Sequence, residues 1–192
     1  MMLAAFDHPV FDSQRNFREL LQAMARPAMP RTLPVLPPAP APATPAAMAV
    51  LLTLCDTSTT VWLQQPHDAL AQHLRFHTGA RLVQEPAEAD FALISDPQTM
   101  PPLTAFALGD SRYPDRSASL VLQVEGFHPG TGYRFAGPGI RDTERVRIDG
   151  LPERFWTERA ALAPRFPLGI DLYFVAAQNV LALPRTTRKL ED

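Results

Sequence analysis

Apolar residues in the N-terminal part of the chain recur at helical spacing. They lie three or four positions apart and so share one face of a helix. These residues are Phe17, Leu20, Leu21 and Met24. Asp12 or Ser13 can cap this helix, and Pro27 ends the pattern. The pattern therefore predicts a first helix between these limits.

Two further helices are predicted from their ends. Thr44 supplies a hydroxyl cap and Pro45 suits a first helical position, and residues 46–55 are apolar on nearly all sides. We expect that helix to be buried rather than amphipathic. Residues 66–78 form the next helix, with Gly79 as its terminator. Shorter helices are predicted over residues 103–108 and 151–161.

Short apolar runs rich in β-branched residues predict the strands. Single strands are expected over residues 60–63 and 91–94. Two hairpins are expected, the first pairing 119–124 with 133–135 and the second pairing 171–175 with 180–183. The charged tail, 188–192, is expected to fray. Because helices and strands alternate throughout, the predicted class is α/β in a single domain, 1–192.

Residues 27–45 contain eight prolines. Such a segment cannot form a regular helix or a central strand, so it predicts an extended connector. A stiff surface linker is the favoured interpretation, and a proline-rich ligand for a partner domain is the alternative.

Composition narrows the function. The chain has 192 residues, of which 46% are hydrophobic and 20% charged, with a net charge of -2. This charge argues against general binding to nucleic acid or to membrane surfaces. No window reaches the ~18 apolar residues of a membrane span. The N-terminal residues lack the features of a signal peptide, so the expected location is the cytoplasm.

The sequence predicts no catalytic group. Cys55, the single cysteine, lies beside an apolar run and is interpreted as a buried structural thiol rather than a nucleophile. Lys189, the single lysine, lies in the tail and is unsuited to a pyridoxal phosphate Schiff base. His73 and His77 share a helix face, but zinc needs a third protein ligand, so no metal is predicted.

Two arginine-bearing segments are candidate anion sites. Gly137-Pro138-Gly139 is interpreted as a tight turn, or alternatively as an anion nest completed by Arg141. Pro184-Arg185-Thr186-Thr187 follows a strand, and its arginine with two hydroxyls suits phosphate. The alternative is that Arg185 pairs with Asp171 or with a carboxylate of a partner. We expect Arg185 to be exposed and to contribute under ~1 kcal/mol to stability.

Several short segments, in this order, resemble the PhnH family, the H subunits of bacterial carbon–phosphorus lyase. The resemblance runs nearly end to end. The segments that carry it are Phe17-Arg18, Ala23-Met24-Ala25-Arg26-Pro27, residues 51–56, Val61-Trp62-Leu63, Leu74-Arg75-Phe76-His77-Thr78, Gly137-Pro138-Gly139-Ile140, residues 166–172 and Pro184-Arg185-Thr186-Thr187.

The resemblance implies a mixed sheet flanked by helices, like the fold of pyridoxal-phosphate-dependent transferases but without the cofactor. It also implies a homodimer in isolation and assembly with lyase subunits G, I and J. The implied function is to support transfer of an alkylphosphonate onto the ribose of a nucleoside triphosphate. An autonomous protein that binds or converts a phosphorylated nucleoside is the alternative. Contact with the nucleoside triphosphate or the phosphonate, or with a partner, is expected at Arg18, Arg26, Arg75, His77, Arg141, Asp171, Arg185, Thr186 and Thr187.

Overall fold

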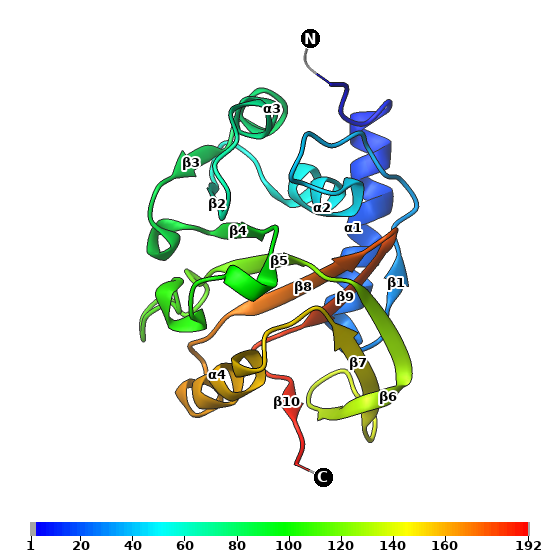
Figure 1. Ribbon diagram of the computed structural model, residues 1–192, viewed down its shortest axis with the longest axis vertical. Coiled ribbons are helices and arrows are strands. Elements are labelled where there is room, and N and C mark those ends of the chain that lie inside the picture. Colours follow the sequence, from blue (N-terminus) through cyan, green and yellow to red (C-terminus); the bar gives the residue numbers. More distant parts are fainter. Residues whose placement is uncertain (1–2, 192) are drawn as a thin grey trace.

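The computed structural model describes residues 3–191, which form two sheets with helices on both faces of the larger one (Figure 1). The α-helices are α1 (Pro9–Ala25), α2 (Pro45–Leu54), α3 (Asp68–Thr78) and α4 (Arg154–Leu162). The 3-10 helices are η1 (Pro86–Glu88), η2 (Pro97–Thr99), η3 (Leu103–Ala105) and η4 (Ala163–Arg165). The predicted α/β class is confirmed.

The larger sheet has seven strands in the order β1-β9-β8-β5-β4-β2-β3. Their bounds are β1 (Arg31–Thr32), β2 (Thr60–Leu63), β3 (Arg81–Val83), β4 (Phe91–Ile94), β5 (Ser119–Gln123), β8 (Asp171–Ala176) and β9 (Asn179–Leu183). The run from β3 to β8 is parallel, whereas β9 and β1 add antiparallel strands at one edge. The central strands are apolar on both faces, as expected for parallel strands covered on both sides.

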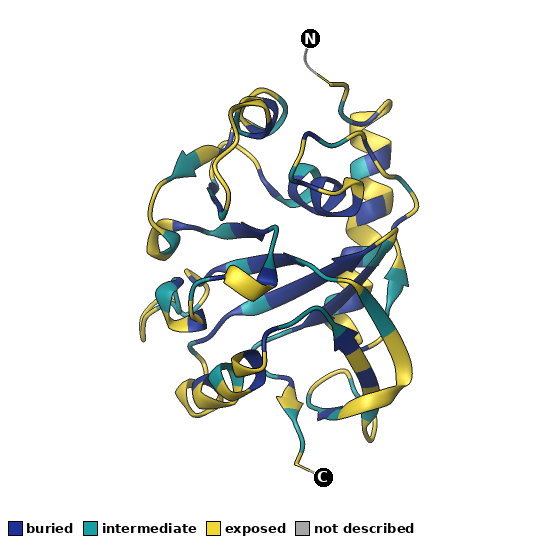
Figure 2. Ribbon diagram, viewed as in Figure 1, coloured by how far each residue is buried: buried dark blue, intermediate teal, exposed yellow. Residues whose placement is uncertain are grey.

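A separate core lies on each face of this sheet. One core holds α2 together with Leu20 of α1 and Leu70 and Leu74 of α3. The other packs Phe155 and Trp156 of α4 against the opposite face. Figure 2 shows the central strands as buried between these layers. The sheet is therefore the middle layer of three.

The buried second helix follows its sequence signals. The Thr44 hydroxyl accepts a hydrogen bond from the Ala47 N–H at 3.3 Å, and Pro45 occupies the first turn. Residues 46–51 are all buried. Cys55 follows the helix, and burial raises the pKa of its thiol to about 12, as suits a structural cysteine. Among the described residues, no helix is long and apolar enough to cross a membrane.

The first helix begins earlier than its sequence suggested. Pro9 occupies its first turn, and the carboxylate of Asp12 accepts from the backbone N–H of His8 at 2.9 Å. The predicted apolar face is divided, because Leu20 is buried while Phe17 and Leu21 are exposed. The shorter helices also shift, to η3 (Leu103–Ala105) and α4 (Arg154–Leu162).

The prediction that 119–124 and 133–135 form a hairpin is wrong. Strand β6 (Gly126–Ala136) instead pairs antiparallel with β7 (Glu144–Asp149), a strand that the sequence analysis missed. The glycine-rich segment expected to be a loop lies within β6, where the register shifts between Pro129 and Tyr133. Glycine tolerates the irregular backbone that such a shift requires.

The prediction of a frayed tail is also wrong for the described residues. Strand β10 (Arg188–Lys189) pairs antiparallel with β6, and the three strands β10, β6 and β7 form the second sheet. The 188–189 backbone thus adds a strand to the edge of this sheet. The final hairpin of β8 and β9 is confirmed.

Between α1 and α2 the proline-rich connector contains no helix, as predicted, and includes the two residues of β1, but the chain turns at residues 27–28 and 41–43. It is nevertheless packed against the domain, since Leu33, Pro37, Pro40 and Ala43 are buried. It is therefore part of the fold and not a free linker.

We expect His73 to make stability depend on pH. Its side chain is buried without a hydrogen-bond partner among residues 3–191, and burial together with the charge of His77 lowers its pKa. The unfolded chain then binds the proton more readily, so stability present above about pH 6.5 is lost as pH falls, by up to about 1.4 kcal/mol per pH unit.

Urea unfolding between pH 7.5 and pH 5 measures this effect. His73→Leu should flatten the dependence, while His67→Leu, at an exposed position before α3, should retain it. An unchanged pH dependence in His73→Leu would contradict the assignment.

Candidate functional site

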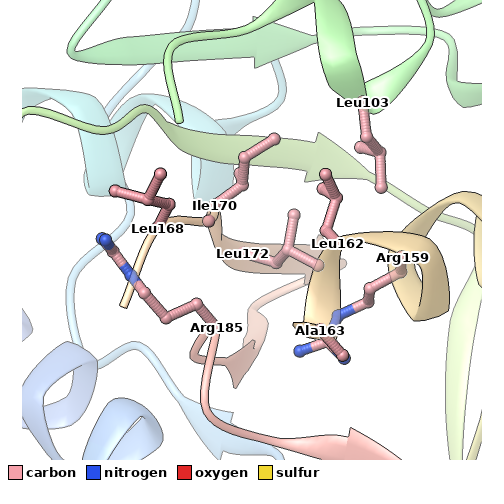
Figure 3. Close-up of a pocket in the computed structure, with 9 residues that line it drawn as sticks. Leu103, Arg159, Leu162, Ala163, Leu168, Ile170, Leu172 and Arg185 are labelled. Carbon is pink, nitrogen blue, oxygen red and sulfur yellow. The ribbon is translucent and has the colours of Figure 1, made fainter. Parts of the chain in front are cut away.

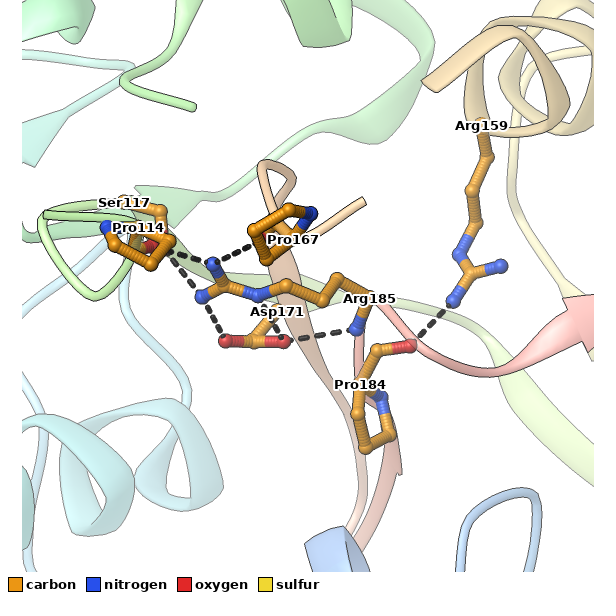
Figure 4. Close-up of polar contacts among 7 residues, drawn as sticks. All are labelled: Pro114, Ser117, Arg159, Pro167, Asp171, Pro184 and Arg185. Carbon is orange, nitrogen blue, oxygen red and sulfur yellow. Dashed lines mark hydrogen bonds and ion pairs between the residues drawn. The ribbon is translucent and has the colours of Figure 1, made fainter. Parts of the chain in front are cut away.

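An ion pair between Asp171 and Arg185 stands at one end of the β8–β9 hairpin (Figure 4). Strand β8 begins at Asp171, and Leu172 is paired with Leu183, so Arg185 follows the ladder closely. Its Nη2 lies 2.6 Å from Asp171 Oδ2, and its Nε lies 3.3 Å from Oδ1. The backbone N–H of Arg185 also donates to Oδ1, at 2.8 Å. Hairpin geometry therefore brings the two residues together.

All five side-chain N–H groups of Arg185 have acceptors. Beyond the two bonds to Asp171, Nη1 donates to the carbonyl oxygens of Pro114 at 2.6 Å and Pro167 at 3.2 Å. Nη2 also donates to the hydroxyl of Ser117. Because arginine has five such donors, none is left for an added phosphate. A ligand contact through this guanidinium would require one of these bonds to break.

The expectation that the Arg185 side chain is exposed is wrong, and with it goes the reason for expecting only a small contribution to stability. Its side chain is only 16% exposed, and that of Asp171 is 23% exposed. Of the two alternatives drawn from the sequence, the structure shows the pairing with Asp171. Removing one partner of such a buried pair leaves an uncompensated charge and several unpaired acceptors.

A second arginine, missed by the sequence analysis, holds the turn that follows β9. Arg159 of α4 donates to the carbonyl oxygen of Thr187 at 2.8 Å and to that of Pro184 at 2.9 Å. Figure 4 shows the bond to Pro184. Burial lowers the pKa of Arg159 to about 10, an effect that the charge of Asp171 opposes, so the side chain remains protonated at neutral pH. The sequence could have indicated this residue, because Arg159 lies four residues after the buried Phe155 and therefore on the inward face of α4.

Figure 3 shows a small cavity that Arg159 and Arg185 both border. Its volume is about 20 Å³, and its other lining residues are mainly aliphatic. A single water molecule needs about 10–15 Å³ by this measure. The cavity is therefore a packing gap and not a substrate site.

The turn at 184–187 contacts the glycine-rich loop after β6. The Ile140 N–H donates to the Gly137 carbonyl at 3.1 Å, so this loop is a tight turn. A Cβ at Gly137 would lie 2.9 Å from the Thr186 carbonyl oxygen. At Gly139, where φ is +85°, a Cβ would lie 2.1 Å from the Ala25 carbonyl oxygen. The loop thus fits between the 184–187 turn and the end of α1.

Several of the predicted residues therefore lie in neighbouring segments. Thr186 is half-buried and Thr187 is buried on one side of the loop, while Arg26 ends α1 on its other side. Arg141 follows the loop and is exposed. Arg18 lies on the exposed side of α1.

Arg75 and His77 do not join this group, because both lie on α3 near the far edge of the large sheet (Figure 1). The ring of His77 lies 4.4 Å from that of His73, and its Nε2 lies 3.2 Å from the Leu3 carbonyl oxygen. Within residues 3–191, no three His, Cys, Asp or Glu side chains are placed to hold a metal ion.

The carboxyl ends of the parallel strands offer the usual ligand crevice of such sheets. In this protein, two polar side chains at the ends of β2 and β5 hydrogen-bond to the chain's own backbone. The Gln64 amide donates to the Asp96 carbonyl at 2.8 Å and accepts from its N–H at 2.9 Å. The Gln123 amide likewise donates to Pro42 at 3.0 Å and accepts from Thr44 at 2.5 Å. The proline-rich connector thus covers the end of β5.

Fold and site together define a three-layer α/β protein. The polar side chains at the ends of its strands hydrogen-bond to other parts of the same chain. The chain belongs to the family of bacterial phosphonate metabolism proteins (PhnH), whose model matches residues 4–189. The family expected from the short sequence segments is therefore confirmed.

Two relatives give this membership a context. The chain is 40% identical to the alpha-D-ribose 1-methylphosphonate 5-triphosphate synthase subunit PhnH of Rhizobium meliloti (strain 1021), over 96% of this chain and 93% of that protein. It is 31% identical to the putative C-P lyase subunit protein HtxG of Stutzerimonas stutzeri, over 91% of this chain and 84% of that protein. Both similarities extend across the whole fold.

We expect Arg185→Ala to destabilise the protein by about 3 kcal/mol, because it leaves the largely buried Asp171 without its partner. Urea unfolding followed by circular dichroism measures the loss. Arg165→Ala is the matched control, since Arg165 is exposed in η4 and its side chain has no ion-pair or hydrogen-bond partner among the described residues. Equal stabilities for the two variants would show that the pair does not hold the fold.

Proposed function

We propose that this chain is the H-type subunit of an alkylphosphonate ribosyl triphosphate synthase of the carbon–phosphorus lyase pathway. In that role it supports transfer of an alkylphosphonate onto the ribose of a nucleoside triphosphate. The observation that carries the proposal is the 40% identity to the Rhizobium meliloti synthase subunit over 96% of this chain. The match of the PhnH model to residues 4–189 supports it.

The structure supports a subunit that acts through its complex. The Gln64 and Gln123 amides at the strand ends hydrogen-bond to the chain's own backbone, and the donors of Arg185 are all engaged. Lys189 places its ammonium 4.4 Å from the centre of the Tyr133 ring, on the edge strand β10. This lysine is thus not enclosed as a Schiff-base lysine would be. The likeness to the fold of pyridoxal-phosphate-dependent transferases stays a prediction from the family resemblance.

An exposed apolar face on α1 is suited to contact with another chain. Val10, Phe17 and Leu21 lie seven and four residues apart, so they share one face of the helix. Phe17 is 47% exposed and Leu21 is 53% exposed. Such a row of large apolar side chains is characteristic of a protein interface. Arg18, on the exposed side of the same helix, supplies a charge near this row.

We assign to this α1 face the self-contact of a homodimer in the isolated protein. A two-fold axis would place the same apolar residues of two copies against each other. In the complete complex the proposed partners are lyase subunits G, I and J, and the proposed location is the cytoplasm. The residues Arg18, Arg26, Arg75, His77 and Arg141 are the proposed contacts that remain available on the surface.

The alternative, an autonomous protein for a phosphorylated nucleoside, needs its cationic residues on one site. The structure separates Arg75 and His77 from the other predicted residues and engages Arg185 with Asp171. These observations favour the subunit role.

We expect the purified chain to release no base from a nucleoside triphosphate supplied with methylphosphonate. Turnover should appear only when subunits G, I and J are added, and omission of this chain from the mixture should reduce it. Chromatographic detection of the free base measures both. Base release by this chain alone would establish the autonomous alternative instead.

We expect the double variant Phe17→Glu/Leu21→Glu to abolish the homodimer while leaving the fold intact. Charged side chains at the centre of an apolar contact must be desolvated without partners. Light scattering gives the mass, and circular dichroism checks the fold. Gln22→Glu/Gln14→Glu places the same charges on exposed polar positions of α1 and should remain dimeric. A double Phe17/Leu21 variant with the wild-type dimer mass would exclude this face.

A further inference from the structure

A cavity of about 180 Å³ lies between α4 and β10. These two elements are neighbours in the fold (Figure 1). The cavity is separate from the smaller gap between Arg159 and Arg185, although Arg159 borders both. The residues that line it are Trp156, Arg159, Ala160, Ala163, Thr187, Arg188 and Lys189. We call it the α4–β10 cavity.

Three of its lining residues are cationic and none is acidic. Arg188 is exposed, and its side chain has no ion-pair or hydrogen-bond partner among residues 3–191. The Lys189 ammonium makes its one described contact with the Tyr133 ring. Two N–H groups of Arg159 donate to carbonyl oxygens, and the other three of its five donors have no acceptor within residues 3–191. The positive charge of this cavity is therefore not neutralised from within its lining.

Asp171 is the carboxylate whose charge acts on Arg159. It is already paired with Arg185, so it cannot compensate both arginines in full. Desolvated cations without equal counter-charge are costly in a folded protein and favour a site where an anion binds.

The hydroxyl of Thr187 gives an independent sign of a missing partner. Thr187 lines the cavity and is 99% buried, and its Oγ1 has no hydrogen-bond partner among the described residues. Buried hydroxyl groups in native proteins are almost always paired. A hydroxyl can donate to an anionic oxygen, so an oxyanion bound beside the cations would supply the missing acceptor once the nearly buried Thr187 side chain turns toward the cavity.

We infer that the α4–β10 cavity binds the oxyanion of a phosphate or phosphonate group. Small-molecule pockets usually measure about 300–1,000 Å³, so this one suits a single tetrahedral group and not a whole nucleotide. A second cavity, of about 220 Å³, shares Arg188 and Ala163 with it and also includes Phe166 and Thr186. That second cavity would hold the remainder of a larger phosphorylated ligand.

The site is an addition to the proposed function and does not rest on it, because charge, volume and the unpaired hydroxyl define the ligand class. It also differs from the phosphate site suggested by the sequence, in which Arg185 was the main donor. Here Arg159 and Arg188 take that place, and Arg185 remains in its ion pair.

Isothermal titration calorimetry on the chain alone tests the inference. The probes are inorganic phosphate, methylphosphonate and ATP, each at one fixed ionic strength because the contacts are electrostatic. Similar affinities for all three would show that the free group is recognised, and tighter binding of ATP would show that the group is recognised on a larger ligand. Either result supports the site, and no binding of any probe overturns it.

Variants locate the binding. Thr187→Val removes only the unpaired hydroxyl and should weaken binding about tenfold, whereas Thr187→Ser should retain it. Arg188→Ala should also weaken binding about tenfold through loss of a charge-assisted bond. Arg165→Ala removes an exposed arginine that does not line the cavity and is the matched control. Unchanged affinity in both Thr187→Val and Arg188→Ala would overturn the assignment, whether or not the chain joins a complex.

Discussion

The ion pair of Asp171 and Arg185 is the contact on which the arrangement around the strand ends depends. It joins the start of β8 to the end of β9 and, through Pro114 and Pro167, to two loops distant in sequence. A buried charge pair is retained in a fold only when its hydrogen bonds are satisfied, and this one satisfies every donor of the arginine. The guanidinium thus links, through its hydrogen bonds, backbone segments that are distant in sequence. In the oxyanion site that we infer, the ligand is therefore contacted by Arg159 and Arg188 and not by Arg185.

Local signals predicted the parts of the fold that they control directly. Thr44 and Pro45 set the start of α2, and the apolar runs gave the central strands and the β8–β9 hairpin. Strand β7 was missed although Arg145-Val146-Arg147-Ile148 alternates as a half-buried strand does, with Val146 and Ile148 buried. The glycines before it suggested a loop. A register shift in β6 accommodates them, and such a shift depends on the partner strand rather than on local sequence.

The candidate site was also predicted only in part, because local sequence determines some of its contacts while others come from distant segments. The hairpin places Asp171 beside Arg185, so their pairing could be anticipated from the sequence as one of two alternatives. Whether the arginine was exposed could not, since the acceptors from Pro114 and Ser117 come from a loop far along the chain. Arg159 was not predicted because short sequence motifs do not show which face of a helix a residue lies on. A charged residue on the inward face of α4 is visible only when helical spacing is applied to it.

The first helix shows how a subunit differs from an independent domain. Its inward face holds Asp12 and Asn16, and the Asn16 amide bonds the backbone of Val35 in both directions, at 2.9 and 3.2 Å. The Asn16 amide thus fixes the proline-rich connector to the domain, while Asp12 accepts from the His8 N–H at the start of the helix. Its outward face carries Phe17 and Leu21. An independent domain gains nothing from apolar residues in water while it buries polar ones. Leu20 and Ala23 of the same helix are buried in the core of the chain. The exposed apolar residues are explained if the outward face lies inside a larger assembly, so that the helix contributes to one core within the chain and to a second core between chains.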